Sequence, residues 1–279
     1  MAAYLDTNVF DHLYKKVGCS GADIANLRKK IYGRELSIPL SIHTLEEILL
    51  DRRARPELLV AKIKLTLSLA NFRRMVKPCD QLLSDDIRAY AATGEAALPF
   101  IDANLQNIIS DGLTELIETD GEELDEDLIA ALEETRRQKE HFRDGIRMHR
   151  AENQEAAASI AGQVTFDEYF DLMAPSAARS FAERAGALAE CENRGLEGLL
   201  NIRSVRMSVG ASLSFIYAWS FEELSPNIGD SKDLLHAASA AAVAETFVTD
   251  DATLRRIVAR VPLDGFEALD LPAFLQRVT

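Results

Sequence analysis

Four acidic residues of the sequence stand where an apolar strand pattern gives way to a helical one. Asp6 and Asp251 each follow a short apolar run, Glu47 lies in the first turns of an expected helix, and Asp233 opens an alanine-rich helix. Clustered carboxylates repel one another and persist mainly where a divalent cation neutralises them, and Mg²⁺ and Mn²⁺ prefer such oxygen ligands. A bound ion of this kind can activate a water and offset the charge that develops on a phosphodiester. The four acids therefore indicate metal-dependent hydrolysis.

The two ends of the chain, which must position these acids, alternate strand patterns with helical ones. Strand patterns occur at Ala2–Leu5, Glu35–Leu40, Met75–Val76, Thr246–Thr249 and Phe266–Leu269. Helical patterns begin after Asp6, near Ser20, after Ser41, at Pro56, at Asp230 or Ser231, at Ala252 and at Leu271. This alternation predicts an α/β fold with a parallel sheet flanked by helices. The carboxyl ends of parallel strands form a ligand crevice, so acids just beyond them can converge although 245 positions separate Asp6 from Asp251.

Residues 95–228 show no convincing strand pattern. Their helical patterns cover Asp125–Arg150, Thr165–Leu172, Ser176–Cys191 and Leu196–Trp219. We therefore expect one discontinuous α/β domain, made of residues 1–94 and 229–279, that is interrupted by a large all-α insertion at residues 95–228.

The charge of the chain is uneven along its length. The 279 residues include 31 Lys and Arg against 45 Asp and Glu, a net charge of −14, whereas nucleic-acid binders normally carry a basic surplus. Residues 95–228 hold most of the excess acid, with 11 basic and 26 acidic residues. Residues 1–94 carry 15 basic and 11 acidic residues, and residues 229–279 carry 5 and 8. The two ends together are close to neutral, which is compatible with a phosphate backbone as ligand.

Each acid taken singly also fits an ordinary structural role. Asp and Glu near helix N-termini often cap the helix or interact favourably with its dipole. A shared site is favoured because four such acids occur in order at the ends of strands and the starts of helices. The spacing from Ser41 and the following Ile48 favour Glu47 over its neighbour Glu46. The spacing Thr249-x-Asp251 favours Asp251 over its neighbour Asp250. Asp230 could be an additional ligand, and we interpret it as a cap.

The ordered motifs resemble those of PIN-domain nucleases. The resemblance rests on Asp6-Thr7-Asn8-Val9, Ser41-x-x-Thr44-x-x-Glu47-Ile48, Asp233-x-x-x-Ala237-Ala238 and Phe247-Val248-Thr249-x-Asp251. It covers residues 1–94 and 229–279, about half of the chain. Each motif is weak by itself, and the specificity lies in the ordered set with its matching strands and helices.

The resemblance implies a PIN-like fold and an endoribonuclease that cleaves single-stranded RNA. The four acids would be the catalytic residues and would bind one or two Mg²⁺ or Mn²⁺ ions, with a metal-bound water as nucleophile. Asn8 and Thr249 match positions that orient the acids through hydrogen bonds. The 186 positions between Glu47 and Asp233 separate this chain from the compact toxin-type members of the family. The helical insertion could read the substrate, cover the site or hold a partner.

Two other functions stay open at this point. A haloacid-dehalogenase-like phosphatase also begins with a strand and an Asp, and often carries a late Gly-Asp…Asp motif, here from Gly229 to Asp233. That family needs a second Asp where this chain has Asn8, and it leaves Glu47 and Asp251 without a role. The other alternative is a PIN-like binding or scaffold module whose insertion covers the site.

Basic residues near the acids are candidates for contact with the substrate. Arg52, Arg53 and Arg55 follow Glu47 and could meet phosphate. Basic residues at helical spacing between Arg136 and Arg150 form a stripe, which we interpret as a solvated face rather than as an RNA-tracking surface.

The histidines and cysteines show no metal-ligand spacing. His43 and His236 lie near the proposed acids, and we interpret both as structural side chains. Three isolated cysteines without a CxxC pair fit a reducing cytoplasm. No secretory signal and no apolar stretch of membrane-spanning length is recognised. The expected partner is single-stranded RNA, with an antitoxin-like or other protein, or a second copy of the chain in a homodimer, as further partners; no membrane partner is expected.

Overall fold

The computed structural model describes residues 1–50, 56–120, 164–222, 224–225 and 230–278, together with the single residues 130, 134, 137 and 144. The candidate substrate-binding residues Arg52, Arg53 and Arg55 lie outside these ranges, and so do the basic residues of the stripe between Arg136 and Arg150. Within the described ranges, every helix is too short or too polar to cross a membrane.

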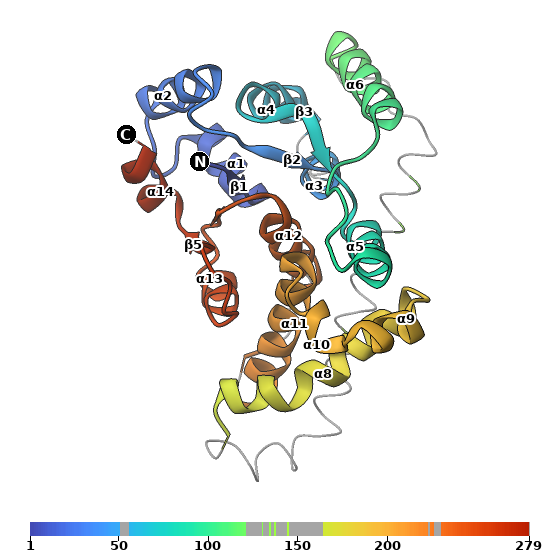
Figure 1. Ribbon diagram of the computed structural model, residues 1–279. Coiled ribbons are helices and arrows are strands. Elements are labelled where there is room, and N and C mark those ends of the chain that lie inside the picture. Colours follow the sequence, from blue (N-terminus) through green and yellow to red (C-terminus); the bar gives the residue numbers. More distant parts are fainter. Residues whose placement is uncertain are drawn as a thin grey trace.

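Short parallel strands form the centre of the fold in the part of the chain that the structure describes (Figure 1). β1 (Ala3–Leu5), β4 (Thr246–Val248) and β5 (Glu267–Leu269) make one sheet in the order β1-β4-β5, and β2 (Pro39–Ser41) pairs with β3 (Asn71–Val76). A parallel bridge between Ala2 and Ser37 joins the start of β1 to the chain just before β2. The order across the fold is therefore β3-β2-β1-β4-β5, all parallel, and the predicted α/β fold with a parallel sheet is confirmed.

This strand order determines where a ligand site can form. The chain first builds outward on one side of β1 and later returns to the other side as β4. The crevice for ligands in such sheets opens at the carboxyl ends of the two strands that flank this reversal. Asp6 is the first residue after β1, and Thr249 is the first residue after β4.

Helices cover both faces of the sheet, because side chains of a strand alternate between its faces. Ala3 and Leu5 pack on one face against α1 (Thr7–Lys15), α2 (Gly21–Tyr32) and α14 (Leu271–Val278). Tyr4 and Phe247 pack on the other face against α11 (Arg203–Phe221), α12 (Asp230–Val243) and α13 (Ala252–Ala259). α3 (Ile42–Leu50), α4 (Pro56–Leu69) and α6 (Ala103–Glu118) surround β2 and β3. Burial on both faces explains the nearly continuous apolar character of the strands.

The described parts of residues 95–228 contain helices and no strand; Phe100 makes only an isolated bridge with Val76. These parts include α8 (Phe166–Arg184), α9 (Leu188–Arg194) and α10 (Leu196–Leu199), which pack with α5 (Cys79–Thr93) and α11 around one apolar core. α11 continues from this core onto the face of the sheet, where it lies beside α12. The packing therefore runs across the sequence boundary expected at residue 228.

The helices expected between Thr165 and Trp219 have different limits in the structure. The helical patterns at Thr165–Leu172 and Ser176–Cys191 are both found in helices, but α8 is continuous through Pro175 and ends before Gly186, which adopts a positive φ of 68° and precedes α9. Proline removes one backbone hydrogen bond from a helix interior, and burial of the adjoining face, including Ala174 and Ala178, offsets that loss. The single helix expected at Leu196–Trp219 is divided into α10 and α11.

Candidate metal centre

Asp6 is held in place by the turn from β1 into α1. It is the N-cap of α1, and its Oδ1 accepts a hydrogen bond of 2.7 Å from the backbone N–H of Thr7. Its Oδ2 accepts hydrogen bonds from Asn8 Nδ2 and Thr249 Oγ1, both at 2.7 Å. Asn8 and Thr249 thus fix the orientation of the Asp6 carboxylate, which is the role that the resemblance implied for them.

Glu47 and His236 come from two different helices, α3 and α12, and lie next to each other. Glu47 lies on α3, whose first turn is capped by Ser41 Oγ, the acceptor for the backbone N–H of Thr44 at 3.1 Å. His236 lies on α12, and its Nε2 is 3.1 Å from Glu47 Oε2. The imidazole is almost completely buried, whereas the Glu47 side chain keeps 21% of its surface exposed. Glu47 is therefore the side of the site that solvent reaches.

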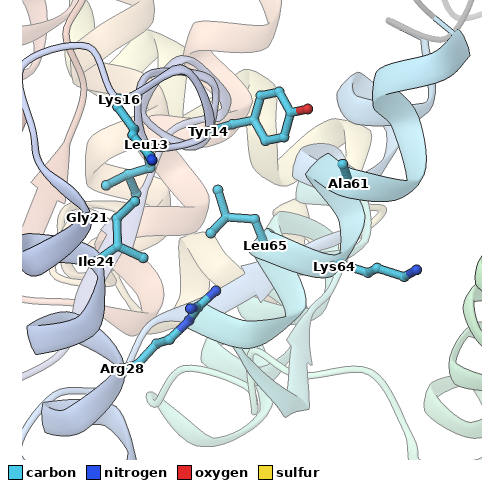
Figure 2. Close-up of a pocket in the computed structure, with 9 residues that line it drawn as sticks. All are labelled: Leu13, Tyr14, Lys16, Gly21, Ile24, Arg28, Ala61, Lys64 and Leu65. Carbon is cyan, nitrogen blue, oxygen red and sulfur yellow. The ribbon is translucent and has the colours of Figure 1, made fainter.

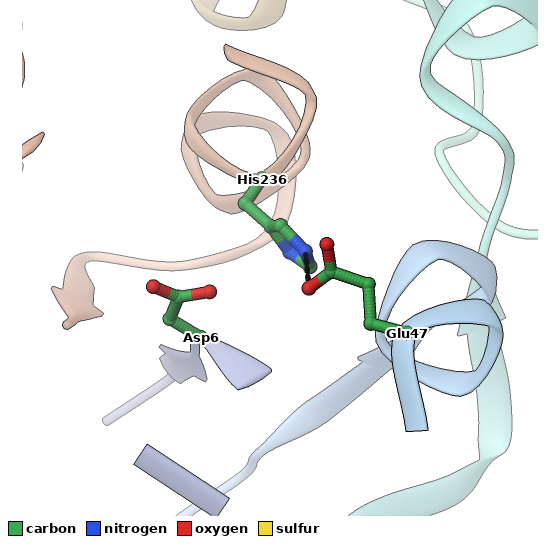
Figure 3. Close-up of side chains that lie close together, drawn as sticks. All are labelled: Asp6, Glu47 and His236. Atoms are coloured by element: carbon green, nitrogen blue, oxygen red, sulfur yellow. Dashed lines mark hydrogen bonds and ion pairs between the residues drawn. The ribbon is translucent and has the colours of Figure 1, made fainter. Parts of the chain in front are cut away.

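Asp6, Glu47 and His236 converge, and we refer to these three side chains as the acid–histidine cluster (Figure 3). Each offers one ligand atom, and these atoms lie within 4.8 Å of one another. Two ligands bound at right angles to one ion, with bonds of about 2.1 Å, lie about 3 Å apart, close to the separation between Glu47 and His236. The donor set and its spacing therefore fit a divalent cation.

Burial and charge affect the three groups in different directions. Burial raises the pKa of Asp6 above its usual value and the charge of Glu47 raises it further, although His236 and the Thr249 hydrogen bond act in the opposite direction. Burial would also raise the pKa of Glu47, but its hydrogen bond and ion pair with His236 hold that pKa well below the usual range. Burial would lower the pKa of His236, and Glu47 and Asp6 outweigh this effect and raise it.

The structure does not bring the other two predicted acids into the cluster. Asp233 lies one turn before His236 on α12 and is partly buried. Asp251 is the N-cap of α13, and its Oδ1 accepts a hydrogen bond of 2.9 Å from Leu254 N–H. The backbone N–H of Asp251 also donates to Thr249 Oγ1 at 3.2 Å, so two hydrogen bonds connect this residue to Asp6.

A second set of polar side chains, which we call the lysine-paired group, lies beside the cluster and consists of His43, Glu46 and Lys232. Glu46 Oε2 accepts hydrogen bonds from Lys232 Nζ at 2.9 Å and from His43 Nδ1 at 3.2 Å. His43 Nε2 accepts the backbone N–H of Cys79 at 2.9 Å, so the ring proton is on Nδ1. Although burial opposes it, these partners lower the pKa of Glu46 to about 2. Glu46 thus pairs with Lys232 and His43, whereas the adjacent Glu47 pairs with His236.

The remaining acids near the site have other positions. Asp250 contacts His12, and its Oδ1 accepts the backbone N–H of Leu271 at 2.9 Å at the start of α14. Asp230 is the first residue of α12, as expected for a residue at a helix start, and its side chain lies outside what the structure describes.

From the sequence we expected both His43 and His236 to be structural side chains. Only His43 has a purely structural set of partners, Glu46 and the backbone N–H of Cys79. His236 is the member of the cluster that the sequence did not identify. The available signal was its position three residues after Asp233, because residues at that spacing lie on one side of a helix.

A pocket of about 490 Å³ lies away from the cluster, between α1, α2 and α4 (Figure 2). It is lined by Leu13, Tyr14, Lys16, Gly21, Ile24, Arg28, Ala61, Lys64 and Leu65. Three of these residues are basic and none is acidic, so the pocket offers no set of ligands for a cation.

Comparison of the chain with models of protein families gave no match, and neither the curated proteins nor the solved structures matched it. The sequence motifs and the geometry of the acid–histidine cluster therefore carry the functional argument.

Proposed function

We propose that the protein is a PIN-like, metal-dependent endoribonuclease that hydrolyses phosphodiester bonds of single-stranded RNA with Mg²⁺ or Mn²⁺. One observation carries this proposal: Asp6 and Glu47 converge with His236 within 4.8 Å at the carboxyl end of β1, beside β4. The order of the four acidic motifs along the chain supports the PIN-like assignment.

The environment of Asp6 supports a cation at this position. Asp6 is only 4% exposed, and the donors that reach it within the described ranges are the neutral groups of Thr7, Asn8 and Thr249. Burying a carboxylate is costly unless nearby charges compensate it, and Asp6 shares the histidine of the cluster, His236, with Glu47. A divalent ion between Asp6 and Glu47 would offset that cost.

The side chains of the site would have different roles in hydrolysis. A bound Mg²⁺ or Mn²⁺ would supply an activated water and would stabilise negative charge on the phosphodiester. Asn8 and Thr249 keep Asp6 Oδ2 in one orientation, so that this ligand needs no rearrangement. Because Glu47 is the exposed member, the RNA approaches from its side. We assign Asp233 and Asp251 to the rim of the site, where they would act on the substrate or on water around the ion.

The phosphatase alternative is less compatible with the contacts of Asp6. That mechanism uses the first Asp as the nucleophile, with a second Asp two positions later. Both oxygens of Asp6 accept hydrogen bonds, and the residue two positions later, Asn8, is one of the donors. The arrangement favours Asp6 as a fixed ligand.

Cleavage of a labelled single-stranded RNA during a titration with Mn²⁺ or Mg²⁺ tests the proposal. We expect cleavage that EDTA abolishes and that Asp6→Asn lowers on the order of 10²-fold or more, because the variant loses a charged ligand. Asp23→Asn is the matched control, since Asp23 is an exposed acid in the capping box of α2. Cleavage without metal, or release of phosphate from a small phosphoester without cleavage of RNA, would contradict the proposal.

A further inference from the structure

We propose that His236 is itself a metal ligand, through Nε2, and that this nitrogen donor makes the site prefer Mn²⁺ over Mg²⁺. The inference rests on the metal site of the proposed function and does not depend on cleavage of RNA. It is based on the convergence of His236 with Asp6 and Glu47 within 4.8 Å, on the Tyr4 hydroxyl that orients the ring, and on the chemistry of imidazole as a ligand.

The hydrogen bonds behind His236 place a proton on Nδ1. This nitrogen is 2.7 Å from the hydroxyl of Tyr4, which is fully buried. The Tyr4 hydroxyl donates its single proton to Ser41 Oγ at 2.6 Å. The phenol oxygen is therefore the acceptor toward His236, and Nδ1 is the donor.

The next link in the network supports this direction. Ser41 Oγ also accepts the backbone N–H of Thr44 at 3.1 Å, and it lies 3.0 Å from Thr44 Oγ1. With two donors already directed at Ser41, its own proton is available for Thr44 Oγ1. In the series of hydrogen bonds that runs from His236 through Tyr4 and Ser41 to Thr44, each contact then has one donor and one acceptor.

With Nδ1 directed at Tyr4, Nε2 is the ring nitrogen that faces Asp6 and Glu47. It lies 3.1 Å from Glu47 Oε2, close enough for a hydrogen bond or ion pair, and a metal ion bound between the two atoms would take the place of the Nε2 proton. A metal ion bound to both atoms and to Asp6 satisfies this arrangement. The Tyr4 hydroxyl, hydrogen-bonded to Nδ1, would then fix the orientation of the metal-bound imidazole.

The nitrogen donor determines which ions bind well. Mg²⁺ favours oxygen ligands and gives up its water molecules reluctantly. Imidazole suits first-row transition ions, whose affinity for mixed nitrogen and oxygen sites rises from Mn²⁺ onward. Two carboxylates and one imidazole therefore favour Mn²⁺ over Mg²⁺, whereas a site made of acids alone would distinguish them less.

Pulsed EPR of the Mn²⁺-loaded protein tests the ligand directly. We expect nitrogen coupling to the bound Mn²⁺ in the unsubstituted protein, lost in His236→Gln and retained in His12→Gln, a more exposed histidine outside the cluster. Calorimetric titration should give an affinity for Mn²⁺ at least about 10-fold higher than that for Mg²⁺. Tyr4→Phe, which keeps the ligand but removes its outer partner, should weaken Mn²⁺ binding about 10-fold and Mg²⁺ binding less.

The outcomes separate this inference from the proposed function. Bound Mn²⁺ without nitrogen coupling, equal affinity for the two ions, or no binding at millimolar Mn²⁺ would overturn the assignment of His236. Because the spectrum is recorded on the unsubstituted protein, a folding defect in His236→Gln does not affect that result. Nitrogen coupling in a protein that leaves RNA intact would keep the ligand assignment and refute the ribonuclease.

Discussion

The acid–histidine cluster and the lysine-paired group are neighbours built from similar side chains. Each contains one histidine and one glutamate, and the two glutamates, Glu46 and Glu47, are consecutive residues of α3. The rings of His43 and His236 lie 6.2 Å apart. In the lysine-paired group the chain supplies its own cation, because Lys232 binds Glu46 at 2.9 Å. In the cluster, Asp6 receives only neutral donors from the described residues.

This difference shows how one helix pair can hold both a structural contact and a site. In the lysine-paired group the buried partner is the Lys232 ammonium, and removing its carboxylate would leave that charge uncompensated, which destabilises the fold. A buried carboxylate that receives only neutral donors is costly until a cation arrives, and such groups are candidates for function. α3 and α12 thus carry one group in which Lys232 is the cation for one glutamate, and one in which a single histidine is shared by two carboxylates, Asp6 and Glu47.

The largest expected contrast is between two adjacent glutamates. Glu47→Gln should lower Mn²⁺-dependent cleavage of RNA on the order of 10²-fold, because it removes a charged ligand of the proposed site. Glu46→Gln should change cleavage by no more than about 3-fold under conditions in which circular dichroism shows both variants folded. Equal losses in the two variants would remove the distinction between the two groups.

The stability of the metal-free protein should show the reverse order. In EDTA, Glu46→Gln should lower the free energy of unfolding by about 2–3 kcal/mol, because it leaves the buried ammonium of Lys232 without its partner. Asp6→Asn should not lower it, since burial raises the pKa of Asp6 and disfavours its ionised form. Urea denaturation measures both values, and a larger loss for Asp6→Asn would contradict the comparison.

The contribution of Glu46 should depend on pH with a definite sign. Its pKa is about 2 in the folded protein, below its ordinary value of 4.5, so folding favours the ionised form. The stabilisation is fully present above about pH 4.5 and is lost as the pH falls toward 2. The difference in urea midpoint between the unsubstituted protein and Glu46→Gln should therefore shrink between pH 6 and pH 3, and a constant difference would refute this assignment.

The smallest expected effect is stabilisation by the metal. At a Mn²⁺ concentration 10 times the dissociation constant, the unsubstituted protein should gain about 1.4 kcal/mol of unfolding free energy. Glu46→Gln should gain the same increment, and Asp6→Asn should gain none at that concentration. Thermal denaturation with and without Mn²⁺ checks this, and an equal gain in Asp6→Asn would place the ion elsewhere.

Local signals in the sequence predicted much of the α/β framework. Apolar runs followed by capping residues located β1 and α1, and likewise β4 and α13 with Asp251 at its N-cap. Asp6 and Glu47 could be placed near each other because parallel strands end at one edge of a sheet. The choice of Glu47 over Glu46 followed from motif spacing, whereas the partners that distinguish the two, Lys232 for Glu46 and His236 for Glu47, come from distant α12.

Features that depend on packing between distant parts of the chain could not be predicted from local sequence patterns. His236 joins the cluster because of the rotation of α12 and the hydroxyl of Tyr4, which is 232 positions away in the chain. The continuity of α8 through Pro175 depends on the core that its alanines enter. The packing of α11 on the sheet also has no local signal, since its apolar residues read equally well as the core of a separate helical unit.

A crystal of the protein soaked in Mn²⁺, measured at the manganese absorption edge, tests the central claim most directly. We predict one anomalous peak within bonding distance of Asp6, Glu47 and His236 Nε2, lost in crystals of Asp6→Asn. An absence of any peak at saturating Mn²⁺, or a peak only at acids outside the cluster, would contradict the account.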